Sequence, residues 1–301
     1  MAYFPCRTPG WILGLLAAIF GSGGSLCGLP ARACEPPAGP AATAAGLPSA
    51  VTAAAATRRT SEERLPLEQY RDRPDVRANL RYFLGPGRRQ LERALSRGTP
   101  HLLSIRRMLQ RERLPEELAW LPVIESGFSN DAVSRKGATG MWQFMPATAR
   151  AYGLRVDRHV DERRDPRKAT RAAIRHLRDL TDQFGSPFLA AAAYNAGAGK
   201  VDRGLQQLNV TDGENDDFFR LSRTGLLARE TQEYVPRLIA AAIIAENPQR
   251  YGIRVTPVSS PDHDSVVVHS AVRLSRIARD LGVSLNTLRR MNPQIDGDIT
   301  P

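Results

Sequence analysis

Cysteine is scarce in this 301-residue chain, and its placement argues against an intrachain disulfide in the mature protein. Cys6 and Cys27 lie in an apolar N-terminal segment that we expect to be removed, which leaves Cys34 alone. No intrachain disulfide can then form, and nothing after Cys34 offers a cysteine nucleophile.

Metal-binding and phosphate-binding patterns are also missing. The five histidines are scattered, and no two of them are spaced i, i+4 as a helical zinc site requires. No serine stands in a G-x-S-x-G setting, and "GSGGS" falls inside the N-terminal segment, where it is no phosphate loop. We therefore expect neither a metal nor a cofactor.

Lysine occurs only at positions 136, 168 and 200, so arginine carries almost all of the formal net charge of +11. Such a surface favours a polyanion: nucleic acid, anionic lipid or an acidic cell-wall polymer. Charge alone does not choose among these partners.

Long hydrophobic runs are absent too. The apolar run from Trp11 to Phe20 has about half of the roughly 20 residues that a membrane-spanning helix needs. Arg7 precedes it, and "ARA" ends at Ala33. This order predicts a secretory signal peptide over residues 1–33, with a disordered apolar tail as the alternative. Export argues against nucleic acid as a partner.

Cys34 follows the predicted cleavage point, where a lipoprotein carries its acylated cysteine. Ala31 and Arg32 fit that signal poorly. Attachment to the outer membrane through a lipid on Cys34 therefore stays open.

The rest of the chain divides by composition. Residues 34–60, mostly Ala, Pro, Gly and Thr, predict a disordered linker. Helical periodicity begins at residue 61 and is clear in the stretches 76–95 and 101–114, within an N-terminal helical region at 61–112. Asp165-Pro166 and Ser186-Pro187 mark two helix starts, and Gly185 marks a stop. An all-α fold is predicted for residues 61–252, with a Pro/Ser linker at 253–264.

One acid stands out in the stretch "LPEELAWLPVIES". A helix that buries Leu118 and Leu121 has no packing reason to end on Glu125, which is either at a frayed, solvated end or functional. A general acid must hold its proton near neutral pH, whereas a free glutamate has a pKa of about 4.3. Apolar surroundings and a helix C-terminus both raise the pKa of a carboxyl group. The segment is therefore suited to an acid catalyst.

Three further blocks follow Glu125 in order: Gly140-Met141-Trp142-Gln143-Phe144-Met145, then Ala193-Tyr194-Asn195-Ala196-Gly197, then Glu230-Thr231-Gln232-Glu233-Tyr234-Val235. Each has a purely structural interpretation when taken alone. Asn195 and Gly197 could end a helix, Trp142 could be core, and Tyr234 could pack on a neighbouring helix.

Taken together with Glu125-Ser126, these blocks resemble the lysozyme-like lytic transglycosylases with an SLT domain, in the membrane-bound transglycosylase D branch. The resemblance implies a catalytic domain at residues 113–252 that cuts peptidoglycan, in a monomer of the periplasm or cell envelope. It implies that Glu125 protonates the MurNAc-β-1,4-GlcNAc bridge and then deprotonates the muramoyl 6-hydroxyl, giving a 1,6-anhydro product. A lysozyme-type hydrolase and a catalytically silent wall-binding scaffold are the rival interpretations.

The resemblance also implies roles for other residues. Ser126 accompanies the acid, while Ser134 and Gln143 would bind the sugar or position Glu125. Met145 and Tyr194 would line the cleft, with Asn195 in support. Glu230 and Tyr234 would close its far side.

The C-terminal residues 265–301 resemble a LysM module, a β-α-α-β unit that binds N-acetylglucosamine chains. "VVVH" predicts a strand, and two short amphipathic helices follow. Ser270-Ala271-Val272 replaces the usual turn, and a closing strand is missing. Glycan binding and a non-binding appendage both stay open.

Overall fold

The computed structural model describes residues 2–5, 64–210, 213–258, 263–266, 268 and 270–300. The predicted signal peptide beyond residue 5, Cys34 and the Ala/Pro linker lie outside these ranges. Within them, no helix combines the length and the apolar character needed to cross a membrane.

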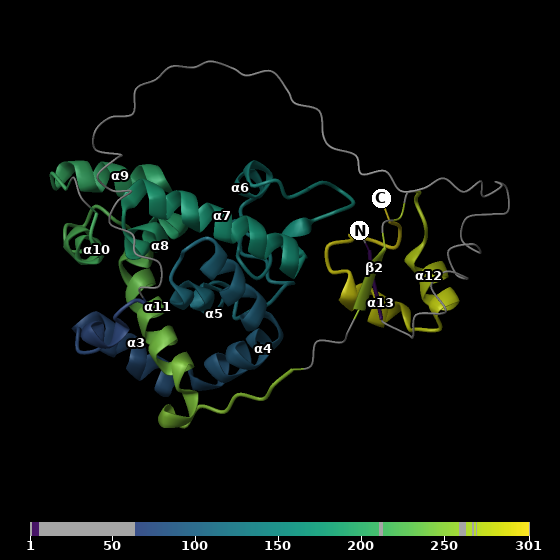
Figure 1. Cartoon of the computed structure of the whole chain (residues 1–301), viewed down its shortest axis with the longest axis horizontal. Coiled ribbons are helices and arrows are strands. Elements are labelled where there is room, and N and C mark those ends of the chain that lie inside the picture. Colours follow the sequence, from purple (N-terminus) through teal and green to yellow (C-terminus); the bar gives the residue numbers. More distant parts are fainter. Residues whose placement is uncertain are drawn as a thin grey trace, which may run out of the picture. The chain divides into compact units, whose positions relative to one another are not determined.

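The body of the protein is all-α, as the sequence predicts (Figure 1). Its helices are η1 (Leu67–Tyr70), α3 (Pro74–Leu84), α4 (Arg88–Arg111), η2 (Glu116–Trp120), α5 (Leu121–Glu125), α6 (Pro146–Ala151), η3 (Glu162–Arg164), α7 (Pro166–Phe184), α8 (Pro187–Ala196), α9 (Ala198–Gln207), α10 (Asn215–Ser222), α11 (Arg229–Glu246) and η4 (Pro248–Tyr251).

Helix α11 is central to the packing, because α3, α5 and α8 all contact it (Figure 1). Its residues 238–244 are buried, so this part of the helix is covered on every side. Helix α8, which packs between α7 and α11, presents buried alanines from Ala190 to Ala193. Small side chains let helix axes approach closely. The alanine-rich sequence therefore allows α8 to pack tightly between its two neighbours.

The predicted start and stop signals of α7 and α8 are confirmed. The Asp165 side chain accepts hydrogen bonds from the backbone N–H groups of Arg167 and Lys168. Ser186 accepts one from Leu189 in the same way. Gly185 ends α7 with a φ of 72°, a left-handed conformation that favours glycine.

Helix α4 runs unbroken through Pro100 and joins the two helical stretches that the sequence suggests on either side. Proline lacks the N–H that would bond to the carbonyl of Ser96. The Thr99 hydroxyl donates to that carbonyl instead, at 2.8 Å. A side chain thus replaces the missing backbone donor.

The C-terminal element contains β2 (His263–Val266), α12 (Leu274–Leu281) and α13 (Leu285–Met291). The strand begins before the predicted "VVVH", of which Val267 and His269 lie outside the described residues. β2 pairs antiparallel with β1 (Ala2–Pro5), with Ala2 opposite Val266. Near the chain end, Thr300 donates its N–H to Val272 at 2.9 Å.

Candidate active site

Glu125 is the last residue of α5, a helix of five residues that follows the 3-10 helix η2. The sequence suggests one continuous helix here, and the structure divides it in two. Leu118 and Leu121 are fully buried, while the Glu125 side chain is half-buried. Gly127 and Phe128 then turn the chain with positive φ values of 61° and 59°. The carboxyl group therefore sits at a sharp end of an apolar segment.

Burial raises the pKa of Glu125 from 4.5 to about 7, and the negative charge of Glu230 adds to the effect. A hydrogen bond from the Tyr234 hydroxyl to Oε1 lowers this pKa and opposes part of the shift. The elevated pKa expected from the sequence is confirmed, with burial as its chief cause. Glu125 is thus partly protonated at neutral pH, as a general acid must be.

Helix α11 supplies both neighbours of Glu125, because Glu230 and Tyr234 lie one helical turn apart. Tyr234 is 6% exposed, whereas Glu230 is exposed at the start of the helix. Burial, followed by the charge of Glu125, raises the pKa of Tyr234 well above its ordinary value. The Tyr234 hydroxyl therefore stays protonated and donates a hydrogen bond to the Glu125 carboxyl group.

Three of the predicted site residues hold the backbone of the segment 140–142. The hydroxyl of Ser126 donates to the Met141 carbonyl at 2.8 Å. The hydroxyl of Tyr194 donates to the Trp142 carbonyl, also at 2.8 Å. The side-chain amide of Gln143 donates to the Gly140 carbonyl at 2.8 Å. Their direct contacts with a sugar stay predictions.

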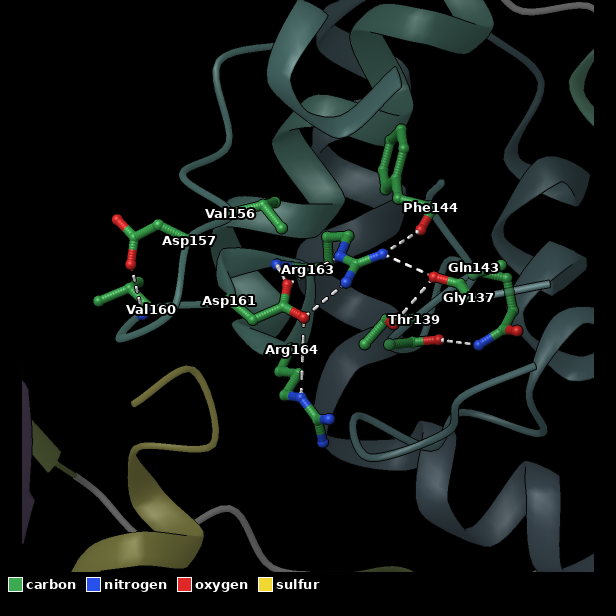
Figure 2. Close-up of polar contacts among 12 residues, drawn as sticks. Gly137, Thr139, Gln143, Phe144, Val156, Asp157, Val160, Asp161, Arg163 and Arg164 are labelled. Atoms are coloured by element: carbon green, nitrogen blue, oxygen red, sulfur yellow. Dashed lines mark hydrogen bonds and ion pairs between the residues drawn. The ribbon is translucent and has the colours of Figure 1, made fainter. Parts of the chain in front are cut away.

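Arg163 anchors the same segment from the other side, a role that the sequence does not reveal (Figure 2). Its Nε and Nη2 form a two-pronged pair with the Asp161 carboxylate, at 2.8 and 2.7 Å. Its Nη1 donates to the carbonyls of Gly137 and Phe144, at 2.8 and 3.0 Å. The Arg163 side chain is 8% exposed. One buried arginine therefore fixes both ends of the segment 137–144.

Close packing requires glycine at position 140. Its φ of 84° is in the left-handed region, and a Cβ placed there would lie 1.9 Å from the Arg163 carbonyl oxygen. Gln143 also has a positive φ, at 51°. Backbone strain of this kind collects at functional sites in proteins.

The other predicted residues occupy more varied settings. The Ser134 hydroxyl accepts the Ala138 N–H at 3.0 Å within a tight turn. The Asn195 side chain accepts from the Thr231 hydroxyl at 2.8 Å, which ties α8 to α11. Met145 is 42% exposed. Roles of these residues toward substrate stay predictions.

The aromatic residues of the second motif belong to the core. Trp142 is fully buried and donates its indole N–H to Thr170 at 3.0 Å. Phe144 is 2% exposed. Asp131, the acid nearest to Glu125 in sequence, has a side chain that is 80% exposed and lies 3.7 Å from Arg164. In the described ranges, no three His, Cys, Asp or Glu side chains are grouped to hold a metal ion.

In this all-α fold, the half-buried Glu125 carboxyl group of raised pKa has the property that a general acid requires. Residues 103–216 match the family described as the transglycosylase SLT domain. The matched residues include Glu125, the loop held by Arg163, and Asn195, while Glu230 and Tyr234 follow them.

Three known proteins illustrate the similarity. The chain is 35% identical over 204 residues to membrane-bound lytic murein transglycosylase D of Escherichia coli strain K12, covering 67% of this chain and 44% of that protein. It is 40% identical over 114 residues to peptidoglycan transglycosylase gp16 of Escherichia phage T7, covering 37% of this chain and 8% of that protein. Among solved structures, an inactive mutant of the lytic transglycosylase Slt from Pseudomonas aeruginosa matches with a TM-score of 0.40 and 26% identity, over 52% of this chain and 25% of that one. The chain thus spans less than half the length of the E. coli relative.

Proposed function

We propose that this protein is an exported peptidoglycan lytic transglycosylase that uses Glu125 as its one general acid and base. The observation that carries the proposal is the raised pKa of Glu125, about 7, in a transglycosylase SLT domain. Similarity to a membrane-bound murein transglycosylase supports a place in the cell envelope. The glycan strands of peptidoglycan are the proposed substrate.

Glu125 acts twice in the proposed reaction. Its carboxyl group first gives a proton to the oxygen that bridges N-acetylmuramic acid and N-acetylglucosamine, and the C1–O bond breaks. The carboxylate then takes the proton of the muramoyl 6-hydroxyl as that oxygen bonds to C1. The products are a free N-acetylglucosamine end and a 1,6-anhydro ring, and no water is consumed.

A second carboxylate is unnecessary in this scheme. Most glycosidases use one to activate water or to attack the sugar. An intramolecular hydroxyl has a high effective concentration, which removes that need. The exposed position of Asp131 agrees with the absence of a second catalytic acid there. Glu230 acts through its charge, which helps Glu125 keep its proton.

Mass spectrometry of the muropeptides released from purified sacculi tests the proposal. We expect wild-type protein to release 1,6-anhydro products, which are lighter by one water than hydrolysis products. Products with the mass of hydrolysis would indicate a lysozyme-type enzyme instead. Release that is equally small for wild type and Glu125→Gln would indicate a wall-binding scaffold.

A further inference from the structure

The first residues of the stretch 253–264, which the sequence predicts to be a linker, are hydrogen-bonded to the catalytic body. Residues 252–258, here called the strap, lie extended along α4 (Figure 1). Alternate strap residues bond to polar side chains of α4: Arg88 to the Gly252 carbonyl, the Arg254 N–H to Glu92 at 3.1 Å, the Thr256 N–H to Ser96 at 3.0 Å, and the Val258 N–H to Thr99 at 2.9 Å.

This regular pairing follows from the two backbone geometries. Two residues of an extended chain advance by about 6.6 Å, and four residues of an α-helix advance by about 6 Å. Each second strap residue therefore meets a new turn of α4. Thr99, which also compensates for Pro100, accepts the last of these bonds. The strap is therefore a hydrogen-bonded part of the catalytic body.

A shallow, open groove of about 450 Å³ is lined by residues of α4 and of the strap. Four arginines line it, together with one acid and two hydroxyl residues: Arg89, Arg93, Arg97, Arg254, Glu92, Ser96 and Thr256. Arg89, Arg93 and Arg97 are spaced i, i+4, i+8, so they follow one face of the helix. The groove is therefore strongly cationic.

The residues that line the groove do not neutralise its positive charge. Glu92 is the one acid among seven arginines of α4, and it already accepts the Arg254 N–H and bonds Arg88. The hydrogen bond from the Arg254 N–H lowers the pKa of Glu92 most, and the pairing with Arg88 lowers it further. Within the part of the chain that the structure describes, the exposed Arg89 and Arg93 have no ion-pair partner. Like charges at i, i+4 spacing repel each other. An external anion would relieve that repulsion.

We propose that this groove binds the carboxylates of the peptide stems on the glycan strand that Glu125 cuts. The planar guanidinium fork matches a carboxylate with two parallel hydrogen bonds. Arg97 also donates to the Gly127 carbonyl at 2.8 Å, two residues after Glu125. The groove wall is thus hydrogen-bonded to the segment that follows Glu125. The assignment rests on the proposed function, because it takes peptidoglycan as substrate.

Binding measurements on the full chain, with Glu125→Gln added to prevent cutting, test this proposal. The groove variant carries Arg89→Gln and Arg93→Gln. The matched control carries Arg107→Gln and Arg111→Gln, which lie on the same helix with the same spacing and are exposed like the groove pair. Both variants lose the same charge, and glutamine preserves helix propensity. The probes are immobilised sacculi with intact stems and the same glycan after an amidase has removed the stems and the lactyl carboxylates that this exposes have been converted to neutral amides.

We expect the groove variant to bind intact sacculi about fivefold more weakly than the control, because it can no longer form two exposed ion pairs with the stems. On stem-free glycan the two variants should bind alike. Equal binding of the two variants to intact sacculi would overturn the proposal. A groove-specific loss on both probes would overturn the stem assignment. Wild-type product release is measured separately, so a failure of catalysis and a failure of this site are distinguishable.

Discussion

Replacing Arg163 with glutamine should loosen the segment 137–144 while leaving Glu125 in its apolar setting. The variant loses the two-pronged pair with Asp161 and both bonds to the carbonyls of Gly137 and Phe144. Removing one partner of a buried ion pair costs about 3–5 kcal/mol. Because the Asp161 side chain is still 16% exposed, we expect about 3 kcal/mol of lost unfolding free energy.

Urea denaturation measures this loss, and steady-state digestion of sacculi measures its effect on activity. We expect kcat/KM to fall about 10- to 100-fold, because the segment that Ser126 and Tyr194 also hold is misplaced. The pH profile should keep its shape, since the surroundings of Glu125 are unchanged.

A double variant separates positioning from stability. In Arg163→Gln alone, the Asp161 carboxylate is left without its arginine partner. Adding Asp161→Asn removes that unpaired charge, so the double variant should recover part of the lost free energy of unfolding. The two carbonyls still lack Arg163, so kcat/KM should stay low. Arg164→Gln is the control, because its distances to Asp131 and Asp161 are long, at 3.7 and 3.9 Å. Wild-type stability and activity in Arg163→Gln, or full recovery of activity in the double variant, would refute the positioning role.

Three further outcomes are expected. Tyr234→Phe removes a hydrogen bond that lowers the pKa of Glu125, so the alkaline limb of the kcat/KM profile should move to higher pH; a move to lower pH would contradict this. Folding raises the pKa of Glu125 from 4.5 to about 7, so ionised Glu125 destabilises the folded state; this cost is absent below pH 4.5 and complete above pH 7. Urea denaturation should therefore show that Glu125→Gln raises the free energy of unfolding by up to about 3 kcal/mol at pH 8 and leaves it unchanged at pH 4. An equal increase at both pH values would exclude this cause. Gly140→Ala should lower the melting temperature far more than Gly137→Ala, because both have a φ above 80° but only position 140 meets the Arg163 backbone; equal losses would show that the clash relaxes.

Much of the fold follows from local signals in the sequence. The Asp165 and Ser186 caps bond to backbone within two or three residues, so their patterns identify the helix starts. A raised pKa of Glu125 could also be predicted, because the residues that precede it in sequence are apolar. In the structure, burial is the chief cause of the raised pKa.

Long-range contacts could not be predicted in the same way. Nothing in the run from Glu162 to Asp165 distinguishes Arg163 from Arg164, yet only Arg163 points into the loop (Figure 2). The bond from Tyr234 to Glu125 spans 109 residues, and motif resemblance rather than periodicity suggests it. The strap appears in sequence as a Pro/Ser linker because its bonds use backbone N–H groups, which every residue except proline has.

Direct titration of the Glu125 carboxyl group is the decisive measurement. Carbon NMR of protein labelled at the glutamate carboxyl carbon, compared with Glu125→Gln to assign the signal, gives its pKa. The account predicts a midpoint near 7 for the free protein. A midpoint near 4.5 would mean that the group is ionised at neutral pH, and Glu125 could then not serve as the general acid.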